Sequence, residues 1–116
     1  MKTKFLKSKI HRATVTDANL EYEGSITIDK ELVVASGLCQ YEKVHVLNVT
    51  TGARIETYVI VAPAGSKEIC INGAAAHLVR PNDCVIILSY CLLDENEISR
   101  FKPIIIKVNN KNEIID

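Results

Sequence analysis

Val44-His45-Val46-Leu47-Asn48-Val49-Thr50-Thr51-Gly52 is the stretch that decides the fold of this chain. Val44, Val46 and Asn48 alternate onto one face, which is typical of a strand with one buried side. Thr50-Thr51-Gly52 then predicts a tight turn, and the apolar run from Ile55 to Ala62 predicts a second strand. The two runs together predict a β-hairpin.

Short strands are also predicted on both sides of this hairpin. They cover residues 5–11, 25–28, 67–71, 84–93 and 103–108. Val85 to Leu88 is apolar on both faces, as in a strand covered on both sides. Residues 109–116 are expected to form a tail whose Ile114 and Ile115 dock on a neighbouring molecule. Many short strands of this kind favour a mainly β fold, a small closed β-barrel.

Helices are predicted to be few and short. Asp29 is a good N-cap for a helix over 30–36, and Gly37 is a good C-terminal stop. Ala74 to Val79 and Asp94 to Arg100 predict two more helices of one or two turns.

The bulk composition is that of one soluble globular domain, spanning residues 1–116. Fourteen basic side chains cancel fourteen acidic ones, so no overall field would draw in nucleic acid or an anionic membrane. No run approaches the ~20 apolar residues of a membrane span, and no signal peptide is evident, so we expect a cytoplasmic protein. Lys2, Lys4 and Lys7 are expected to be solvated on a strand edge.

The cysteines and histidines lack the spacing of a metal or redox site. No two cysteines form a C-x-x-C pair, and the histidines are scattered, so no metal is expected. In a reducing compartment we expect the cysteines to be buried thiols that act as small hydrophobic groups. The four cysteines are Cys39, Cys70, Cys84 and Cys91, and the three histidines are His11, His45 and His77.

Gly24-Ser25 is the pair with the most specific chemistry. Glycine can adopt strained backbone angles, and the serine hydroxyl lies close to the preceding carbonyl carbon. Attack by that hydroxyl would convert the amide to an ester, and elimination followed by hydrolysis would leave a pyruvoyl group. A Gly-Ser pair by itself is most often a turn, so this chemistry needs a wider sequence context.

Three long runs supply that context: His11 to Ser25, Asn48 to Tyr58 and Asn72 to His77. In this order and spacing, they resemble the signatures of the pyruvoyl-dependent aspartate 1-decarboxylases, and the similarity covers almost the whole chain. The resemblance implies a six-stranded, closed double-psi β-barrel and a homotetramer with active sites between subunits. It also implies self-cleavage into a β chain, 1–24, and an α chain, 25–116.

The resemblance further implies the reaction. L-Aspartate would be decarboxylated to β-alanine and carbon dioxide, on the route to pantothenate. The cofactor would be a pyruvoyl group made from Ser25, with no metal and no pyridoxal phosphate. Its ketone would form a Schiff base with the substrate amine and accept the electrons released with carbon dioxide. Tyr58 matches the family residue that returns a proton to the former α-carbon.

Two cations and a threonine match substrate-binding positions of the family. Lys9 and Arg54 would bind the two carboxylates of aspartate, and we infer that Arg54 holds the one that stays. Thr57 matches a residue used both in substrate contact and in self-cleavage, where its hydroxyl would hydrogen-bond the Gly24 carbonyl.

A third segment matches the backbone loop that contacts substrate. It contains Gly73, Ala74 and Ala75, whose small side chains let main-chain N–H groups approach an anion. Asn72, just before it, is expected to orient the backbone at the cleavage site. The chain departs from the family pattern at Leu47, where many members carry tryptophan.

Each of these residues also has an ordinary structural interpretation. Arg54 would be common as a solvated hairpin arginine, and Tyr58 as a core residue. Two other functions therefore stay open: a binding or assembly module without catalysis, and a related chain that tetramerises without being processed. The sequence also leaves open whether cleavage needs a maturation factor.

Overall fold

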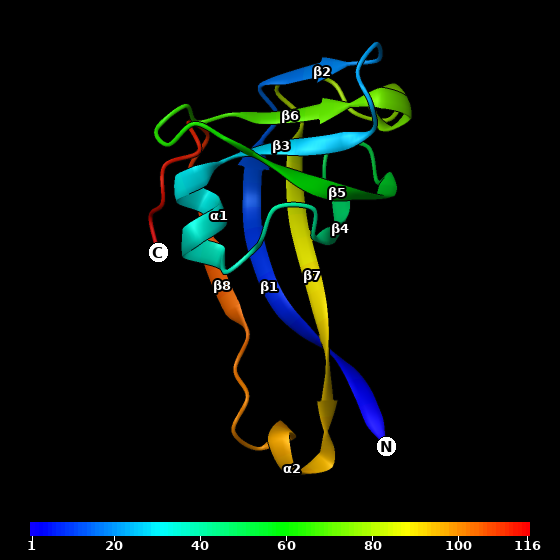
Figure 1. Ribbon diagram of the computed structural model, residues 1–116. Coiled ribbons are helices and arrows are strands. Elements are labelled where there is room, and N and C mark those ends of the chain that lie inside the picture. The colour runs from blue at the N-terminus through cyan, green and yellow to red at the C-terminus, as the bar shows by residue number, and fades with distance from the viewer.

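The computed structural model describes all 116 residues and is built mainly from β-strands (Figure 1). In chain order the elements are β1 (Lys2–Thr14), β2 (Asp17–Asn19), β3 (Ser25–Asp29), α1 (Lys30–Ser36), β4 (Lys43–Asn48), β5 (Arg54–Ala62), β6 (Ile69–Asn72), the 3-10 helix η1 (Gly73–His77), β7 (Cys84–Asp94), α2 (Glu95–Ile98) and β8 (Ile104–Lys107). The prediction of a mainly β protein with a few short helices is confirmed. No helix has the length and apolarity that crossing a bilayer requires.

The predicted hairpin joins β4 to β5 as an antiparallel pair. Asn48 shapes its turn, because the side-chain oxygen accepts hydrogen bonds from the N–H groups of Thr50 (3.0 Å) and Thr51 (3.2 Å). Gly52 follows at a φ of +83°, where a residue without a side chain is favoured. Val44, Val46 and Asn48 are buried on one face, as the alternation predicts.

One mixed sheet contains all eight strands in the order β2-β6-β3-β5-β4-β7-β1-β8. The β2/β6, β3/β5 and β1/β8 pairs are parallel, and the others are antiparallel. Strands β2, β3, β5 and β6 lie at one end of the molecule, and β1 and β7 extend together away from them towards α2 (Figure 1). A cluster of 18 buried apolar residues, mostly isoleucine and valine, forms the core on one face of the sheet.

Helix α1 begins and ends where the sequence predicts. Asp29 accepts a hydrogen bond from the Glu31 N–H (2.9 Å), and Gly37 ends the helix at a φ of +76°. The Asp29 carboxylate also accepts the N–H groups of Gly65 (3.0 Å) and Lys67 (2.8 Å). Burial alone would raise the pKa of Asp29, but these three hydrogen bonds and the Lys67 charge outweigh it and lower that pKa.

One predicted helix differs in type and extent, and one strand was not predicted. The helix expected over 74–79 is a 3-10 helix over Gly73–His77, because Leu78 closes it with an i to i−3 bond to the Ala75 carbonyl (3.0 Å). Strand β2 was not predicted, since three residues are too short to show a periodic pattern.

The C-terminal segment, predicted as a tail, is hydrogen-bonded to its own chain. Asn112 is buried, and its amide donates to the carbonyls of Thr14 (2.9 Å) and Lys67 (2.9 Å). Ile114 forms a β-bridge with Val108. The side chain of Ile114 remains 46% exposed, and docking on a neighbour stays a prediction.

Burial corrects three further expectations. Ile86 and Leu88 are only half-buried, so β7 is fully covered on one face alone. Cys70 is the only buried cysteine, whereas Cys39 is exposed and the others are half-buried. Lys7 is not freely solvated, because it pairs with the Glu42 carboxylate (2.9 Å) and donates to the Gly37 carbonyl (3.0 Å).

Candidate functional site

Four polar side chains form a two-by-two patch across β3 and β6. In this antiparallel pair Ser25 lies opposite Asn72, and Thr27 lies opposite Cys70. Successive side chains of a strand point to opposite faces, so these four share one face. The residues between them and beside them fill the core from the other face and are fully buried: Ile26, Ile28, Ile69 and Ile71. We call the four residues the β3/β6 patch.

The amide of Asn72 ties the patch together. Its nitrogen donates to the Ser25 hydroxyl oxygen (2.9 Å) and to the Thr27 hydroxyl oxygen (3.0 Å). Its oxygen accepts a hydrogen bond from the Cys70 thiol, with the sulfur 3.3 Å away. Ser25 and Asn72 are each 5% exposed, so the arrangement is shielded from water. Asn72 thus contacts the side chain of Ser25, the serine of the predicted cleavage site, directly.

Gly73 lies against the backbone of the predicted cleavage site. Its φ is +74°, and a Cβ added there would lie 2.6 Å from the Gly24 Cα and 3.1 Å from the Tyr22 carbonyl oxygen. A Cβ added at Gly24 would meet nothing within 4 Å. The positive φ and the close approach therefore occur at Gly73, and not at Gly24 as the strain argument from the sequence assumed.

The backbone of η1 continues directly from Asn72 and Gly73. Ala74 is exposed and Ala75 is half-buried, so the segment predicted to contact substrate begins beside the β3/β6 patch. The structure thus brings Gly24, Ser25 and Asn72 together with this segment.

Tyr58 lies beside the patch, on the neighbouring strand. Strand β5 runs parallel to β3 with Val59 next to Ile26, so one residue earlier Tyr58 lies next to Ser25. The Tyr58 ring centroid is 6.2 Å from that of Tyr41, and the Tyr58 hydroxyl forms no hydrogen bond. Its position on the face away from the core suits a side chain that reaches a substrate.

Thr57 faces the opposite way, since it precedes Tyr58 on the strand. It pairs with the core residue Val44, and no hydrogen bond joins its hydroxyl to Gly24. The expected contact with the Gly24 carbonyl is therefore absent from this structure.

The two predicted cations lie on the outer face of the sheet, away from the core. Arg54 is exposed at the start of β5, and Lys9 is half-buried on β1, with β5, β4 and β7 between β1 and β3 in the sheet order. Lys9 pairs with Leu88, and Leu88 pairs with His45, so these side chains share that face. Neither cation takes part in an ion pair. The structure of one chain does not bring them to Ser25.

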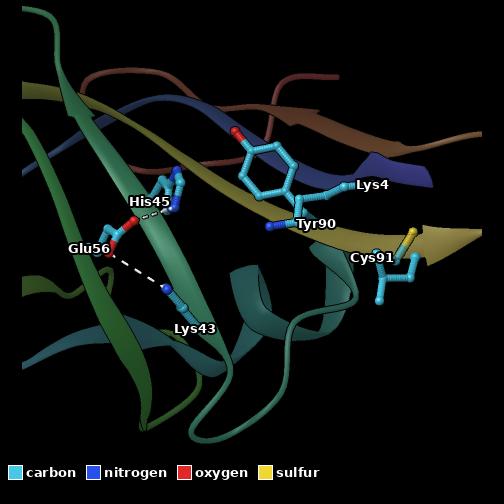
Figure 2. A pocket seen from close by; sticks show the side chains of 7 residues that line it. Lys4, Lys43, His45, Glu56, Tyr90 and Cys91 are labelled. Carbon is cyan, nitrogen blue, oxygen red and sulfur yellow. Dashed lines mark ion pairs between the residues drawn. The ribbon is translucent and has the colours of Figure 1, made fainter. Parts of the chain in front are cut away.

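The same outer face carries a hollow of about 260 Å³ that none of the predicted site residues lines (Figure 2). Glu56 lines it and is paired with His45 (3.1 Å) and Lys43 (3.6 Å). The His45 ring also packs edge-on against Tyr90, with 5.2 Å between centroids. Arg54 lines a separate hollow of about 280 Å³ beside it. Ser25 lines neither of these two hollows.

Sequence reasoning missed Thr27 and Cys70. The signal was present, because Ser25 and Thr27 flank one isoleucine, and Cys70 and Asn72 flank another. Such alternation places the polar pairs on one face, but only the strand pairing brings the two pairs together.

His11 lies on β1 near the predicted Lys9 site. Its Nδ1 is buried without a hydrogen-bond partner, and burial together with the charges of Lys9, Arg12 and Lys107 lowers its pKa. The imidazole is therefore neutral near pH 7. Its interpretation as a structural residue or a neighbour of the cleavage site stays a prediction.

The fold and the β3/β6 patch define a small β protein in which a buried asparagine holds the serine of a Gly-Ser bond. Comparison with known proteins shows the family to which the chain belongs. The model of the aspartate decarboxylase family matches residues 1–115. The chain therefore belongs to the aspartate decarboxylase family.

Individual relatives agree along nearly the whole chain. The Aspartate 1-decarboxylase of Pelotomaculum thermopropionicum is 55% identical over 111 residues, which are 96% of this chain and 84% of that protein. That of Clostridium kluyveri is 54% identical over 114 residues, 98% of this chain and 90% of that protein. That of Corynebacterium efficiens is 57% identical over 110 residues, 95% and 81% respectively.

Proposed function

We propose that this chain, an aspartate 1-decarboxylase by its family, cuts its own backbone between Gly24 and Ser25 and converts Ser25 into the pyruvoyl group with which it works. The activity, that of a carboxy-lyase, follows from family membership and from relatives aligned over nearly the full chain. The observation that carries the self-processing proposal is the 2.9 Å hydrogen bond from Asn72 to the Ser25 hydroxyl oxygen.

The first step of processing uses Ser25 as nucleophile. Its Oγ attacks the Gly24 carbonyl carbon, the carbon–nitrogen bond breaks, and the hydroxyl proton ends on the freed amine, which leaves an ester. Because the Asn72 N–H donates to Oγ, the hydroxyl hydrogen stays free to leave, and the amide dipole stabilises the negative charge that grows on Oγ. The low exposure of both residues strengthens this interaction.

The ester then opens by elimination. Loss of the Ser25 Cα proton breaks the Cβ–Oγ bond, so that the oxygen leaves with Gly24 as a carboxylate. Water hydrolyses the resulting enamine and releases ammonia, which leaves the pyruvoyl group at the head of residues 25–116. The β chain, 1–24, and the α chain, 25–116, are the products.

The surroundings of Ser25 fit such a group. The other side chains of the β3/β6 patch are uncharged, and Gly73 leaves the space that the Gly24 backbone occupies. When present, the group would supply a ketone that binds an amine and accepts the electrons released with carbon dioxide. Gly73, Ala74 and Ala75 would border it through their backbone.

Substrate binding is assigned to the outer face. Arg54 and Lys9 are free of ion pairs, so both remain able to bind the two carboxylates of L-aspartate. Arg54 would hold the carboxylate that stays, since tight pairing of the leaving one would stabilise the ground state. Tyr58 has a free hydroxyl on the same face and would return the proton. Thr57 faces away from this surface and does not reach Gly24 within one chain, so its predicted roles in substrate contact and self-cleavage would require a rearrangement or a second subunit.

A homotetramer of closed double-psi barrels would complete this site. The end of β1 already returns to β6, because Thr16 and Ile69 exchange hydrogen bonds of 2.8 and 3.0 Å, which supports closure of the barrel. The separation of Lys9 from Ser25 along the sheet supports a site shared between subunits. We assign the maturation of Ser25 to the chain itself, and a maturation factor would act only on its rate.

Denaturing mass spectrometry tests the proposal. The purified protein should give two fragments divided at Gly24-Ser25, with ammonia lost and water gained in the larger one. Borohydride reduction in the presence of L-aspartate should then attach the substrate to the larger fragment. A single intact mass that persists after warm incubation would favour a non-catalytic barrel, and a cleaved sample that traps no substrate would refute the role of the pyruvoyl ketone.

A further inference from the structure

We propose that Cys70 is a positioning residue for self-cleavage: its thiol fixes the side-chain amide of Asn72 so that the NH₂ group, and not the carbonyl, faces Ser25. The inference rests on the proposed function, because it concerns the rate at which the Gly24-Ser25 bond is cut. It assigns a role to a residue that neither binds substrate nor supplies the nucleophile.

The orientation of the Asn72 amide needs a cause. The two ends of a carboxamide have nearly the same shape, so their hydrogen-bond partners decide which end points where. Ser25 and Thr27 carry hydroxyls, which donate and accept equally well and therefore accommodate either end. Cys70 differs, because sulfur is a weak acceptor and the thiol is best used as a donor to oxygen.

The geometry places Cys70 where its thiol can determine the orientation of the Asn72 amide. Its sulfur lies 3.3 Å from the Asn72 Oδ1, two residues along the same strand and on the same face. With Oδ1 held there, both amide hydrogens point across to β3, to Ser25 at 2.9 Å and Thr27 at 3.0 Å. Rotation of the amide by a half turn would leave both hydroxyls able to bond, but it would turn an N–H towards the Cys70 sulfur in place of the Oδ1 acceptor.

The thiol keeps its proton under ordinary conditions. Cys70 is 7% exposed, and burial together with the charges of Asp17 and Glu68 raises its pKa. A thiolate could not donate to Oδ1, so this shift maintains the donor at neutral pH. Cys70 is also the only cysteine whose sulfur makes a hydrogen bond, which separates it from Cys39, Cys84 and Cys91.

The consequence for cleavage is specific. With the NH₂ group towards Ser25, the amide stabilises charge on Oγ and leaves its hydrogen free. With the carbonyl towards Ser25, the hydroxyl would donate to the amide, and Oγ would lose the donor that supports its attack. Loss of the thiol donor should therefore slow the acyl shift by about tenfold, the factor that corresponds to one hydrogen bond of ordinary strength.

The test compares two substitutions of one residue. Cys70→Val has similar bulk and no donor, and Cys70→Ser keeps a donor. Cys84→Val is the matched control, a half-buried cysteine on β7 outside the patch. Each full-length chain is purified uncleaved at low temperature and warmed, and the fraction cut at Gly24-Ser25 is followed by denaturing mass spectrometry. Thermal unfolding of every uncleaved chain is measured in parallel.

We expect Cys70→Val to cleave about tenfold more slowly than wild type, and Cys70→Ser and Cys84→Val to remain within about threefold. In an Asn72→Ala background, Cys70→Val should cause no further slowing, because the residue acts through that amide. Equal slowing by Val and Ser, or a rate that only follows the melting temperature, would reduce Cys70 to a packing residue and overturn the inference.

The outcome for wild type separates this inference from the proposed function. If the folded wild-type chain is never cut at Gly24-Ser25, the proposed function fails and the role of Cys70 falls with it. If wild type is cut and Cys70→Val is cut at the same rate, only the role of Cys70 is refuted.

Discussion

The β3/β6 patch and the outer-face cations are two parts of one proposed site, yet they differ in how complete they are. In the patch, Asn72 uses both amide hydrogens and its oxygen within one chain. On the outer face, Lys9 and Arg54 have no acidic partner, and the hollow that Arg54 lines does not include Ser25. The difference fits our proposal that one chain holds the groups for cutting itself, whereas binding of the substrate would need a surface from another subunit.

Of the substitutions that test this comparison, Ser25→Ala should have the largest effect, because it should abolish both cleavage and decarboxylation. Without the hydroxyl no acyl shift can occur, so we expect no cleavage and no decarboxylation, while the fold and the outer face remain intact. Mass spectrometry and carbon dioxide release measure the two outcomes. Decarboxylation by the uncut variant would show that the two regions work independently of Ser25.

Arg54→Ala should separate the two regions. Cleavage at Gly24-Ser25 should proceed at the wild-type rate, because Arg54 lies outside the β3/β6 patch. The ratio kcat/KM for L-aspartate should fall about 100-fold, as expected for loss of a charged hydrogen-bonding pair. Arg54→Lys, which keeps the charge but not the planar fork, should recover only part of it. Slowed cleavage in either variant would contradict the division.

Gly73→Ala should disturb the backbone beside the β3/β6 patch without changing the positions of Lys9 and Arg54. The added Cβ would overlap the Gly24 backbone, at 2.6 Å from its Cα, on a residue whose φ is +74°. We expect a loss of about 3 kcal/mol in the free energy of unfolding of the uncut chain, together with slower cleavage. Ala74→Gly on the exposed neighbour is the control. Unchanged stability in Gly73→Ala would mean that the backbone at Gly24 moves aside freely.

Asp29→Asn tests the far end of the strand that begins at Ser25, with the smallest expected effect. Two N–H groups meet one carboxylate oxygen and a third meets the other, so an amide would turn an NH₂ towards a donor. We expect about 1.5 kcal/mol of destabilisation near pH 7.

The pH dependence of that effect has a definite sign. The pKa of Asp29 in the folded chain is lowered from 3.8, so its contribution is full above about pH 4 and is lost as the pH falls through the folded pKa. The difference in unfolding free energy between wild type and Asp29→Asn should therefore shrink only in acid. A difference that shrinks on raising the pH would refute the lowered pKa.

Local patterns predicted the elements that local forces determine. The β4/β5 hairpin and helix α1 follow from alternation, an N-cap and glycines at positive φ, all within a few residues. Partners far apart in the chain left no such pattern. Asn112 bonds to Thr14 across 98 residues, and nothing in residues 109–116 indicates that contact.

In the candidate site too, residues within sequence motifs were predicted, whereas contacts between distant strands were not. Ser25 and Asn72 were found through motifs, and the strand register then placed them opposite each other. Cys70 was interpreted as one of four equivalent thiols, because its bond to Asn72 matters only once Asn72 faces Ser25. Thr57 was assigned a contact with Gly24, which the alternation of side chains on β5 directs away.

Strand β1 gives self-cleavage a thermodynamic consequence. It lies between β7 and β8, paired with β7 from Lys2 to Thr14 and with β8 from Ser8 to His11. Cutting after Gly24 would leave all of these pairings in place, so the β chain, which also contains β2, would remain part of a sheet whose other strands belong to a second polypeptide. Folding of the uncut chain is unimolecular, but refolding of the cut protein is an association. The melting temperature of the cut protein should therefore fall on dilution. The covalent link between β1 and the rest of the sheet assists the first folding of the chain, and it is absent in any later refolding.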